Sequence, residues 1–171
     1  MNDDKNSKLY EVKTSKIHHK GVYAIKDIPK GKYIIEYKGE KITKEEAEKR
    51  LDQTLKKHKE NPEENAAVYI FELNNEYDID GDIPDNDAKY INHSCDPNCD
   101  FEIKEDQIWL YAIKDIKKGE ELTYNYGFEF DEDYADHPCK CGSKNCVGYI
   151  LSDDEWPKLR EYLEKIKNKQ Q

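Results

Sequence analysis

The chain has few apolar residues and no long run of them. Of its 171 residues, 36% are hydrophobic and 39% are charged, and the mean hydropathy is -1.13. No apolar run approaches the length that crosses a membrane, and residues 1–8 contain no apolar signal core. We therefore expect a protein that is made and kept in the cytosol, without membrane contact. Export, or action in the nucleus of a host cell, stays open as an alternative.

Positive charge is also in deficit. The chain has 28 lysines and arginines against 38 aspartates and glutamates, which gives a formal net charge of -10. An acidic surface repels nucleic-acid phosphates, so we expect no direct binding of DNA or RNA. It attracts basic partners, and a lysine-rich protein or peptide fits that charge, although solubility alone also explains it. The composition leaves the oligomeric state unknown.

The length fits one domain with short tails. We expect a disordered tail over residues 1–8, a main domain over 9–130, a short segment over 131–151, and a C-terminal helix and tail over 152–171. Runs rich in β-branched and aromatic residues predict strands at 22–25, 33–37, 68–73 and 108–113.

Two copies of one strand–turn element stand far apart in the chain. Ala24–Gly31 reads AIKDIPKG and Ala112–Gly119 reads AIKDIKKG. Each copy predicts a strand followed by a turn in which glycine supplies a positive φ. The spacing is too large for a solenoid, so we expect the same element to be used twice in one β-rich fold.

Two helices are expected. The first covers about residues 43–60, where Thr43 and Glu46 form a capping box and Asn61-Pro62 ends the helix. The second covers about residues 153–167, and Ser152/Glu155 and Pro157 suggest different first turns for it. The expected apolar faces are, in the first helix, Ala47, Leu51 and Leu55 and, in the second, Trp156, Leu159, Leu163 and Ile166.

Three segments carry residues suited to chemistry. Residues 90–99 read YINHSCDPNC, residues 119–127 read GEELTYNYG, and Cys139-Lys140-Cys141 is followed by Cys146. Over about residues 15–151, these motifs resemble the signature of SET-domain protein lysine methyltransferases with a cysteine-rich post-SET zinc segment. The resemblance makes 9–130 the SET domain and 131–151 the post-SET segment.

The resemblance implies the SET fold, which is mainly β with some α. Small curved sheets surround a pseudoknot, and an inserted helix, the post-SET segment and a C-terminal helix complete the fold. In this family the Asn92-His93 segment and the Tyr126 segment cross at the pseudoknot. The implied function is methyl transfer from S-adenosylmethionine to the side-chain amine of a protein lysine.

The cysteines predict a structural zinc site. Residues 139–146 hold three thiols, and a tetrahedral zinc needs a fourth ligand, from Cys95 or Cys99. Disulfides are the competing interpretation, but five cysteines leave one unpaired and nothing indicates secretion. The resemblance selects Cys95 as the fourth ligand beside Cys139, Cys141 and Cys146. Cys99 is then the spare thiol.

The resemblance also assigns the cofactor site. His19 stands in place of the first glycine of the family's Gly-x-Gly loop, so this loop needs a different local φ, and Gly21 remains. Lys89 stands where many relatives have arginine, which keeps the charge without the planar fork. The residues expected to bind the cofactor are His18, Lys20, Gly21, Tyr69, Lys89, Asn92 and His93.

Tyr126 matches the family's catalytic tyrosine. The resemblance makes Tyr69, Phe71, Tyr124 and Phe128 the aromatic walls of the lysine channel. A desolvated channel is useful because only about one lysine in 2,500 is neutral at pH 7. A tyrosine at position 124 restricts the space beside the amine, so we expect mainly monomethylation.

Residues 78–87 hold a dense cluster of aspartates. The aspartates between Asp78 and Asp87 do not match a calcium-binding EF-hand loop, since Ile83 and Lys89 occupy the glycine and glutamate positions. The resemblance ends a strand at Asp80, and the remaining aspartates fit an acidic rim or a solvated loop equally well. The alternative functions are a catalytically weak SET-like module that binds basic protein tails, and a zinc-stapled structural protein.

Overall fold

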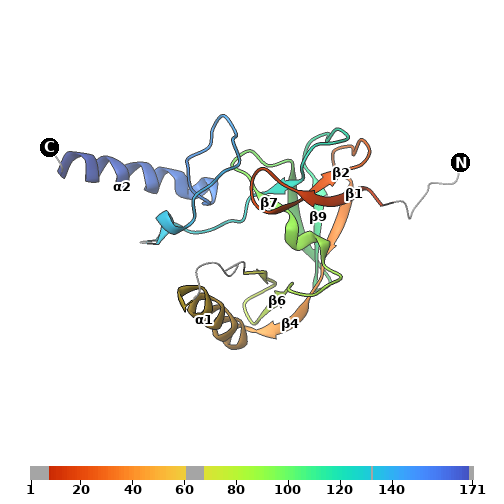
Figure 1. Ribbon diagram of the computed structural model, residues 1–171, viewed down its shortest axis with the longest axis horizontal. Coiled ribbons are helices and arrows are strands. Elements are labelled where there is room, and N and C mark those ends of the chain that lie inside the picture. The colour runs from red at the N-terminus through yellow and green to blue at the C-terminus, as the bar shows by residue number, and fades with distance from the viewer. Residues whose placement is uncertain (1–7, 61–67, 132, 170–171) are drawn as a thin grey trace, which may run out of the picture. The chain divides into compact units, whose positions relative to one another are not determined.

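The computed structural model describes residues 8–60, 68–131 and 133–169, and strands dominate it (Figure 1). The disorder expected for residues 1–7 and the helix end expected at Asn61-Pro62 lie outside this range. The chain divides into two compact units. The first comprises the described parts of residues 1–32, 91–100 and 112–171, and the second those of 33–90 and 101–111. Within the described ranges, no helix is both long enough and apolar enough to cross a membrane.

The first unit contains two small sheets. Strand β1 (Tyr10–Thr14) pairs antiparallel with β2 (Lys20–Ala24), and β7 (Asn92–His93) pairs parallel with β10 (Thr123–Tyr124). The β7–β10 pair lays two distant sequence motifs side by side, as the resemblance implied. The fully buried apolar side chains of the first unit include Val22, Ile28, Ile91, Ile116, Leu122, Leu151 and Leu159.

The two copies of the strand–turn element pair with each other inside this unit. Ile28 and Ile116 exchange backbone hydrogen bonds of 2.8 Å in both directions. The N–H of Gly31 donates to the alanine that begins the other copy, at 2.7 Å, and the N–H of Gly119 does the same in return, also at 2.7 Å. Both glycines have the positive φ that the turn predicts, 83° and 91°. The internal repeat is therefore a pair of matched elements.

The C-terminal helix begins later than predicted. Residues 153–155 form a 3-10 turn, η3 (Asp153–Glu155), and α2 (Trp156–Lys169) follows. Ser152 makes no side-chain capping bond, and Pro157 occupies the first turn of α2, so the interpretation based on Pro157 fits. On the predicted apolar face, Leu159 is buried and the other members are half-buried.

The second unit holds most of two three-stranded sheets. In one sheet β9 lies between β3 and β8, and in the other β6 lies between β4 and β5. The strands are β3 (Tyr33–Tyr37), β4 (Glu40–Thr43), β5 (Ile70–Glu72), β6 (Tyr77–Asp80), β8 (Cys99–Lys104) and β9 (Gln107–Ala112). The four strands predicted from β-branched runs are all present. Strand β3 has the predicted ends, whereas β2, β5 and β9 have shifted ends.

Helix α1 (Lys44–Glu60) confirms the expected inserted helix. The Thr43 hydroxyl accepts a 3.3 Å hydrogen bond from the backbone N–H three residues later, as a capping threonine does. The predicted apolar face is buried only at Ala47, whereas Leu51 is 36% and Leu55 is 42% exposed. The predicted helix is thus present, and two of the three residues of its apolar stripe are exposed in the structure.

Two of the clustered aspartates have structural partners. Asp78 is buried and accepts a 2.6 Å hydrogen bond from Lys44, and Asp80 accepts one of 2.6 Å from Arg50. Both partners come from helix α1, so these ion pairs fasten the helix to strand β6. Asp80 ends β6, as the resemblance implied.

Candidate active site and metal centre

Tyr126 lies beside the β7–β10 pair and is held at two atoms. Its backbone N–H donates to Nδ1 of His93 at 3.2 Å, and its hydroxyl donates to the carbonyl of Ile91 at 3.0 Å. Burial lowers the pKa of His93 to about 4, so the imidazole is neutral and Nδ1 is free to accept. Residues of the first unit thus hold both the backbone and the side-chain hydroxyl of Tyr126, the predicted catalytic residue.

Asn92 is the centre of a hydrogen-bond cluster. Its Nδ2 donates to the carbonyl of Lys20 at 2.9 Å, to Oε1 of Glu121 at 2.8 Å and to Oγ of Ser15 at 3.2 Å. A carbonyl and a carboxylate can only accept, so the amide nitrogen must face them. The Asn92 side-chain oxygen is thereby oriented the other way, where it can accept from a ligand's N–H.

Glu121 organises the same cluster and was not predicted. Besides Asn92, its carboxylate accepts hydrogen bonds of 2.7 Å from Ser15 Oγ and 2.7 Å from the Tyr23 hydroxyl. A Cβ atom at Gly21 would lie 2.3 Å from Glu121 Oε1, which is too close for any side chain. Gly21 is therefore needed to let this carboxylate approach strand β2. The sequence signal was the second glutamate of GEELTYNYG, to which no role was assigned.

The different local φ expected for the loop around His18 is not seen, because His19 keeps a positive φ like that of a glycine. His19 has a φ of 32°, in the left-handed region that glycine adopts without strain, and its carbonyl accepts a 3.0 Å bond from the Ser15 N–H. Burial lowers the pKa of His18, and the charges of His19 and Lys140 lower it further. The loop is thus closed on Ser15, which also contacts Asn92.

Two of the predicted channel residues lie with Tyr126 in the first unit. The ring centroid of Tyr126 is 4.9 Å from that of Tyr124 and 5.8 Å from that of Phe128. Tyr124 is only 9% exposed, whereas Phe128 is 40% exposed and touches His137 at 5.3 Å between ring centroids. These three aromatic residues form a continuous row of ring contacts.

The other two predicted channel residues, Tyr69 and Phe71, lie in the second unit, as does the predicted cofactor-binding residue Lys89. The Phe71 ring packs 5.0 Å from Tyr37, whose hydroxyl donates to the Tyr69 carbonyl at 2.7 Å. Lys89 Nζ lies 5.2 Å from the Tyr69 ring and 3.0 Å from a carboxylate oxygen of Asp82. Burial lowers the pKa of Lys89, but Asp82 outweighs it and holds that pKa above its ordinary value. Tyr69 and Lys89 are thus brought together, and their cofactor role stays a prediction.

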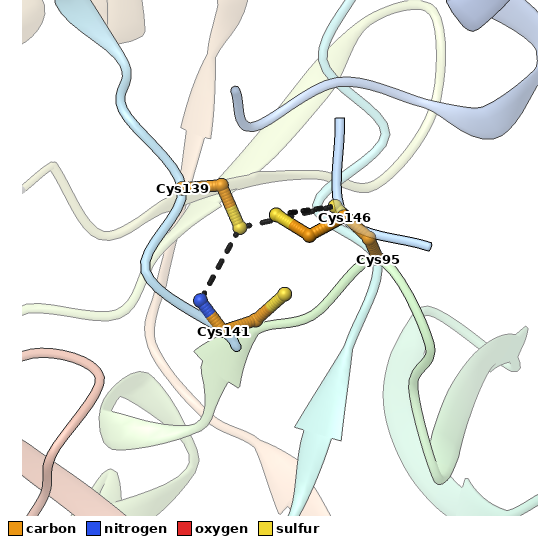
Figure 2. Close-up of side chains that lie close together, drawn as sticks. All are labelled: Cys95, Cys139, Cys141 and Cys146. Carbon is orange, nitrogen blue, oxygen red and sulfur yellow. Dashed lines mark hydrogen bonds between the residues drawn. The ribbon is translucent and has the colours of Figure 1, made fainter. Parts of the chain in front are cut away.

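The four predicted metal ligands converge in the first unit (Figure 2). Their sulfur atoms all lie within 4.8 Å of one another, and Cys95 Sγ lies 3.8 Å from both Cys139 Sγ and Cys146 Sγ. A tetrahedral zinc with Zn–S bonds of about 2.3 Å requires sulfur–sulfur distances of about 3.8 Å. The group is therefore the right size to hold zinc.

Backbone and side-chain donors support negative sulfur in this group. N–H groups of Cys141 and Gly148 donate to Cys139 Sγ at 3.5 Å and Cys146 Sγ at 3.4 Å. Burial raises the pKa of Cys141, but hydrogen bonding with Ser143 outweighs it and the pKa falls to about 6. Burial raises the pKa of the Cys95 and Cys139 thiols, so a metal that binds all four sulfurs must displace protons from these two.

Cys99 stands apart from the four-cysteine group. It is 1% exposed, and burial raises the pKa of its thiol to about 12. All five cysteines are free thiols, so the structure contains no disulfide between them. Cys99 is the small buried thiol that the spacing left over.

This chain is similar in sequence to known proteins. Residues 19–127 match the family model of the SET domain. The chain is 43% identical over 136 residues, 77% of its length, to human histone-lysine N-methyltransferase 2D and covers 2% of that protein. It is 37% identical over 151 residues, 85% of its length, to a histone-lysine N-methyltransferase, H3 lysine-4 specific, of Chaetomium globosum, and covers 14% of it.

The chain therefore spans a small fraction of the length of the relatives it matches. Its match nevertheless includes the motifs around Asn92, Cys95 and Tyr126, which the structure places together. The small antiparallel sheets and few helices agree with the fold that the motifs implied. The chain belongs to the SET-domain family and has the SET fold.

Proposed function

We propose that this chain transfers a methyl group from S-adenosylmethionine to the side-chain amine of a protein lysine. The observation that carries the proposal is the fixed hydroxyl of Tyr126, held by the Ile91 carbonyl beside the Asn92 and His93 motif. The relatives named above are histone-lysine N-methyltransferases, which supports the same reaction for this chain. The cysteine group supports a structural zinc beside it.

The cofactor side of the site is the Asn92 cluster. When bound, S-adenosylmethionine supplies an electrophilic methyl group. The Asn92 side-chain oxygen accepts from an ammonium donor, because its nitrogen is committed to Lys20 and Glu121. His18 lies in the loop before strand β2, and Gly21 in that strand has no side chain to obstruct the Glu121 carboxylate that holds Asn92. We propose that these residues hold the amino-acid end of the cofactor.

Tyr126 aligns the lysine nucleophile. Its hydroxyl proton is donated to Ile91, so the phenol oxygen accepts an N–H from the neutral amine. That contact directs the nitrogen lone pair toward the methyl carbon, and alignment of this kind is a large part of catalysis. The amine must lose its proton before it attacks, and the aromatic surfaces of Tyr124 and Phe128 favour the neutral form by excluding water.

The zinc does not contact the substrate in this proposal. Cys95 lies two residues after His93, and the three other ligands belong to the segment after Tyr126. A zinc bound to all four cysteines joins these two segments of the first unit. Its role is to hold the segment with Phe128 and His137 in place.

The substrate is a basic protein. The chain carries a net charge of -10, which attracts a lysine-rich segment and repels nucleic acid. A histone tail has this chemistry, and relatives are named for that substrate. The target lysine is identified by incubating the chain with labelled S-adenosylmethionine and either histones or a protein extract, followed by peptide mass spectrometry.

The labelling experiment and a thermal-shift measurement with S-adenosylmethionine together distinguish a methyltransferase from the two alternative functions. For a methyltransferase we expect label on lysine and a thermal shift with S-adenosylmethionine. A module that only binds basic tails shows tail binding without label. A zinc-stapled structural protein contains zinc and shows neither a cofactor shift nor label.

We further propose that the main product is monomethyl-lysine. Tyr124 is buried beside Tyr126, and a hydroxyl there holds a water molecule in the space that a second methyl group needs. Tyr124→Phe frees that space, so its product should shift toward di- and trimethyl-lysine while activity persists. Mass spectrometry of one peptide over a time course checks this. Trimethyl-lysine as the main product of the unchanged chain would contradict it.

A further inference from the structure

The segment after Tyr126 is bonded to the C-terminal part of the chain. The carbonyl of Phe128 accepts a 2.8 Å hydrogen bond from the Ser152 N–H, and the N–H of Phe130 donates to Oε2 of Glu155 at 3.2 Å. Both partners lie just before helix α2, outside the residues that match the SET-domain model (Figure 1). The Phe128 carbonyl and the Phe130 N–H are thus both bonded to the short stretch of chain between Ser152 and Glu155.

Aromatic contacts reinforce these bonds. The Phe130 ring lies 5.2 Å from Tyr134 and 5.5 Å from Tyr162 of helix α2, and the latter two lie 5.7 Å apart. Tyr134 also contacts Tyr149 at 4.8 Å, in the segment that carries the metal ligands. Ring contacts at such distances contribute beyond their buried area.

Burial and charge make Glu155 an effective partner. Its side chain is 13% exposed, and Lys158 binds its other oxygen at 2.7 Å. The bond from Lys158 holds the pKa of Glu155 below its ordinary value, so this carboxylate is ionised at neutral pH. Hydrogen bonds to an ionised acceptor are stronger than neutral ones. Leu151 and Leu159, each 1% exposed, bury the chain on either side of it.

We propose that Leu151–Tyr162 is a latch that positions the Tyr126–Phe130 segment for substrate binding. His93 fixes this segment at the N–H of Tyr126, and the latch fixes it at Phe128 and Phe130. Phe128 is 40% exposed, so burial alone does not fix its place, and the two attachments add to its ring contacts with Tyr126 and His137. Glu155 and Tyr162 are positioning residues in this proposal, which rests on the proposed lysine-methyltransferase function.

The latch predicts an effect on peptide binding that simple destabilisation does not. Loss of the latch frees Phe128, so the KM for the peptide should rise while cofactor affinity and zinc content stay the same. Loss of general stability instead lowers the fraction of active enzyme, and kcat falls without a rise in the peptide KM. The two parameters therefore distinguish positioning from stability.

The test compares the unchanged full chain with three variants, each of which carries one substitution. Glu155→Ala removes the acceptor for the Phe130 N–H, and Glu155→Gln retains an acceptor oxygen. Glu161→Ala is the control, because it removes an exposed glutamate of helix α2 whose partner is Lys165. Amide hydrogen exchange at Phe130 reports the latch without any need for activity. Peptide kinetics and cofactor affinity report its consequence.

We expect Glu155→Ala to speed exchange at Phe130 by about tenfold and to raise the peptide KM by about tenfold, the factor for one hydrogen bond to a charged group. Glu155→Gln and Glu161→Ala should stay within about threefold of the unchanged chain in both, because each keeps an acceptor for Phe130. Unchanged exchange in Glu155→Ala would overturn the latch, and so would faster exchange with an unchanged KM. If the unchanged chain transfers no methyl group, the proposed function fails, and exchange alone decides the latch.

Discussion

At the scale of single residues, identical neighbours have different tasks. Glu120 accepts a 3.0 Å bond from the N–H of Lys117 and closes a turn, whereas Glu121 accepts from Asn92. The sequence could not distinguish the roles of these two glutamates. The side chain that faces Asn92 is decided by a tertiary contact, the backbone bridge between Tyr23 and Glu121. The cysteine spacing predicted the group of thiols that the structure brings together, whereas the roles of Tyr126 and Asn92, which the resemblance implied, stay predictions.

Glu121→Gln should weaken cofactor binding. The carboxylate accepts from Ser15, Tyr23 and Asn92, and an amide has one acceptor oxygen, so at least one donor loses its partner. We expect the Kd for S-adenosylmethionine to rise about tenfold by calorimetry, as for loss of one hydrogen bond to a charged group. Glu120→Gln is the matched control and should bind normally. Equal effects of the two changes would remove Glu121 from the site.

At the scale of elements, local patterns predicted strands well and packing less well. The run at 33–37 is strand β3, because β-branched and aromatic residues bounded by glycine specify an extended backbone locally. Leu51 and Leu55 follow a helical period but are exposed, because burial depends on which elements meet. The start of α2 depended on a choice between two capping patterns that sequence left open.

Ile116→Ala tests the paired strand–turn elements. Ile116 is fully buried at the point where the two copies exchange backbone bonds. Removing its side chain leaves a cavity in the first unit, so the free energy of unfolding should fall by about 2 to 5 kcal/mol in urea denaturation. Leu55→Ala, at a 42% exposed position, should cost much less. A similar loss for both variants would contradict this role.

Cys146→Ser tests the metal centre. The four converging sulfurs should hold close to one zinc per chain by metal analysis, and loss of a ligand should remove most zinc and activity. Cys99→Ser changes a buried thiol outside the group and should keep both. A fall in pH should release the metal, because its ligands must be deprotonated. Equal zinc loss from the two variants would contradict the ligand assignment.

At the scale of the whole molecule, three motifs in order predicted the family and fold. Each motif is short, but few folds bring all three together, and the match over residues 19–127 agrees. The sequence analysis did not foresee that the expected channel residues belong to two different compact units. Tyr124, Tyr126 and Phe128 belong to the first unit and Tyr69 and Phe71 to the second, and sequence order alone does not define compact units.

The central claim is lysine methylation directed by Tyr126, and one comparison tests it most directly. Transfer of labelled methyl from S-adenosylmethionine to a lysine of a basic protein is measured for the unchanged chain and for Tyr126→Phe, which removes one hydroxyl and little volume. We expect site-specific label by the unchanged chain and a rate lower by roughly 10² to 10⁴ in the variant, with similar cofactor affinity. Near-normal turnover by Tyr126→Phe, or no lysine labelled by the unchanged chain, would contradict it.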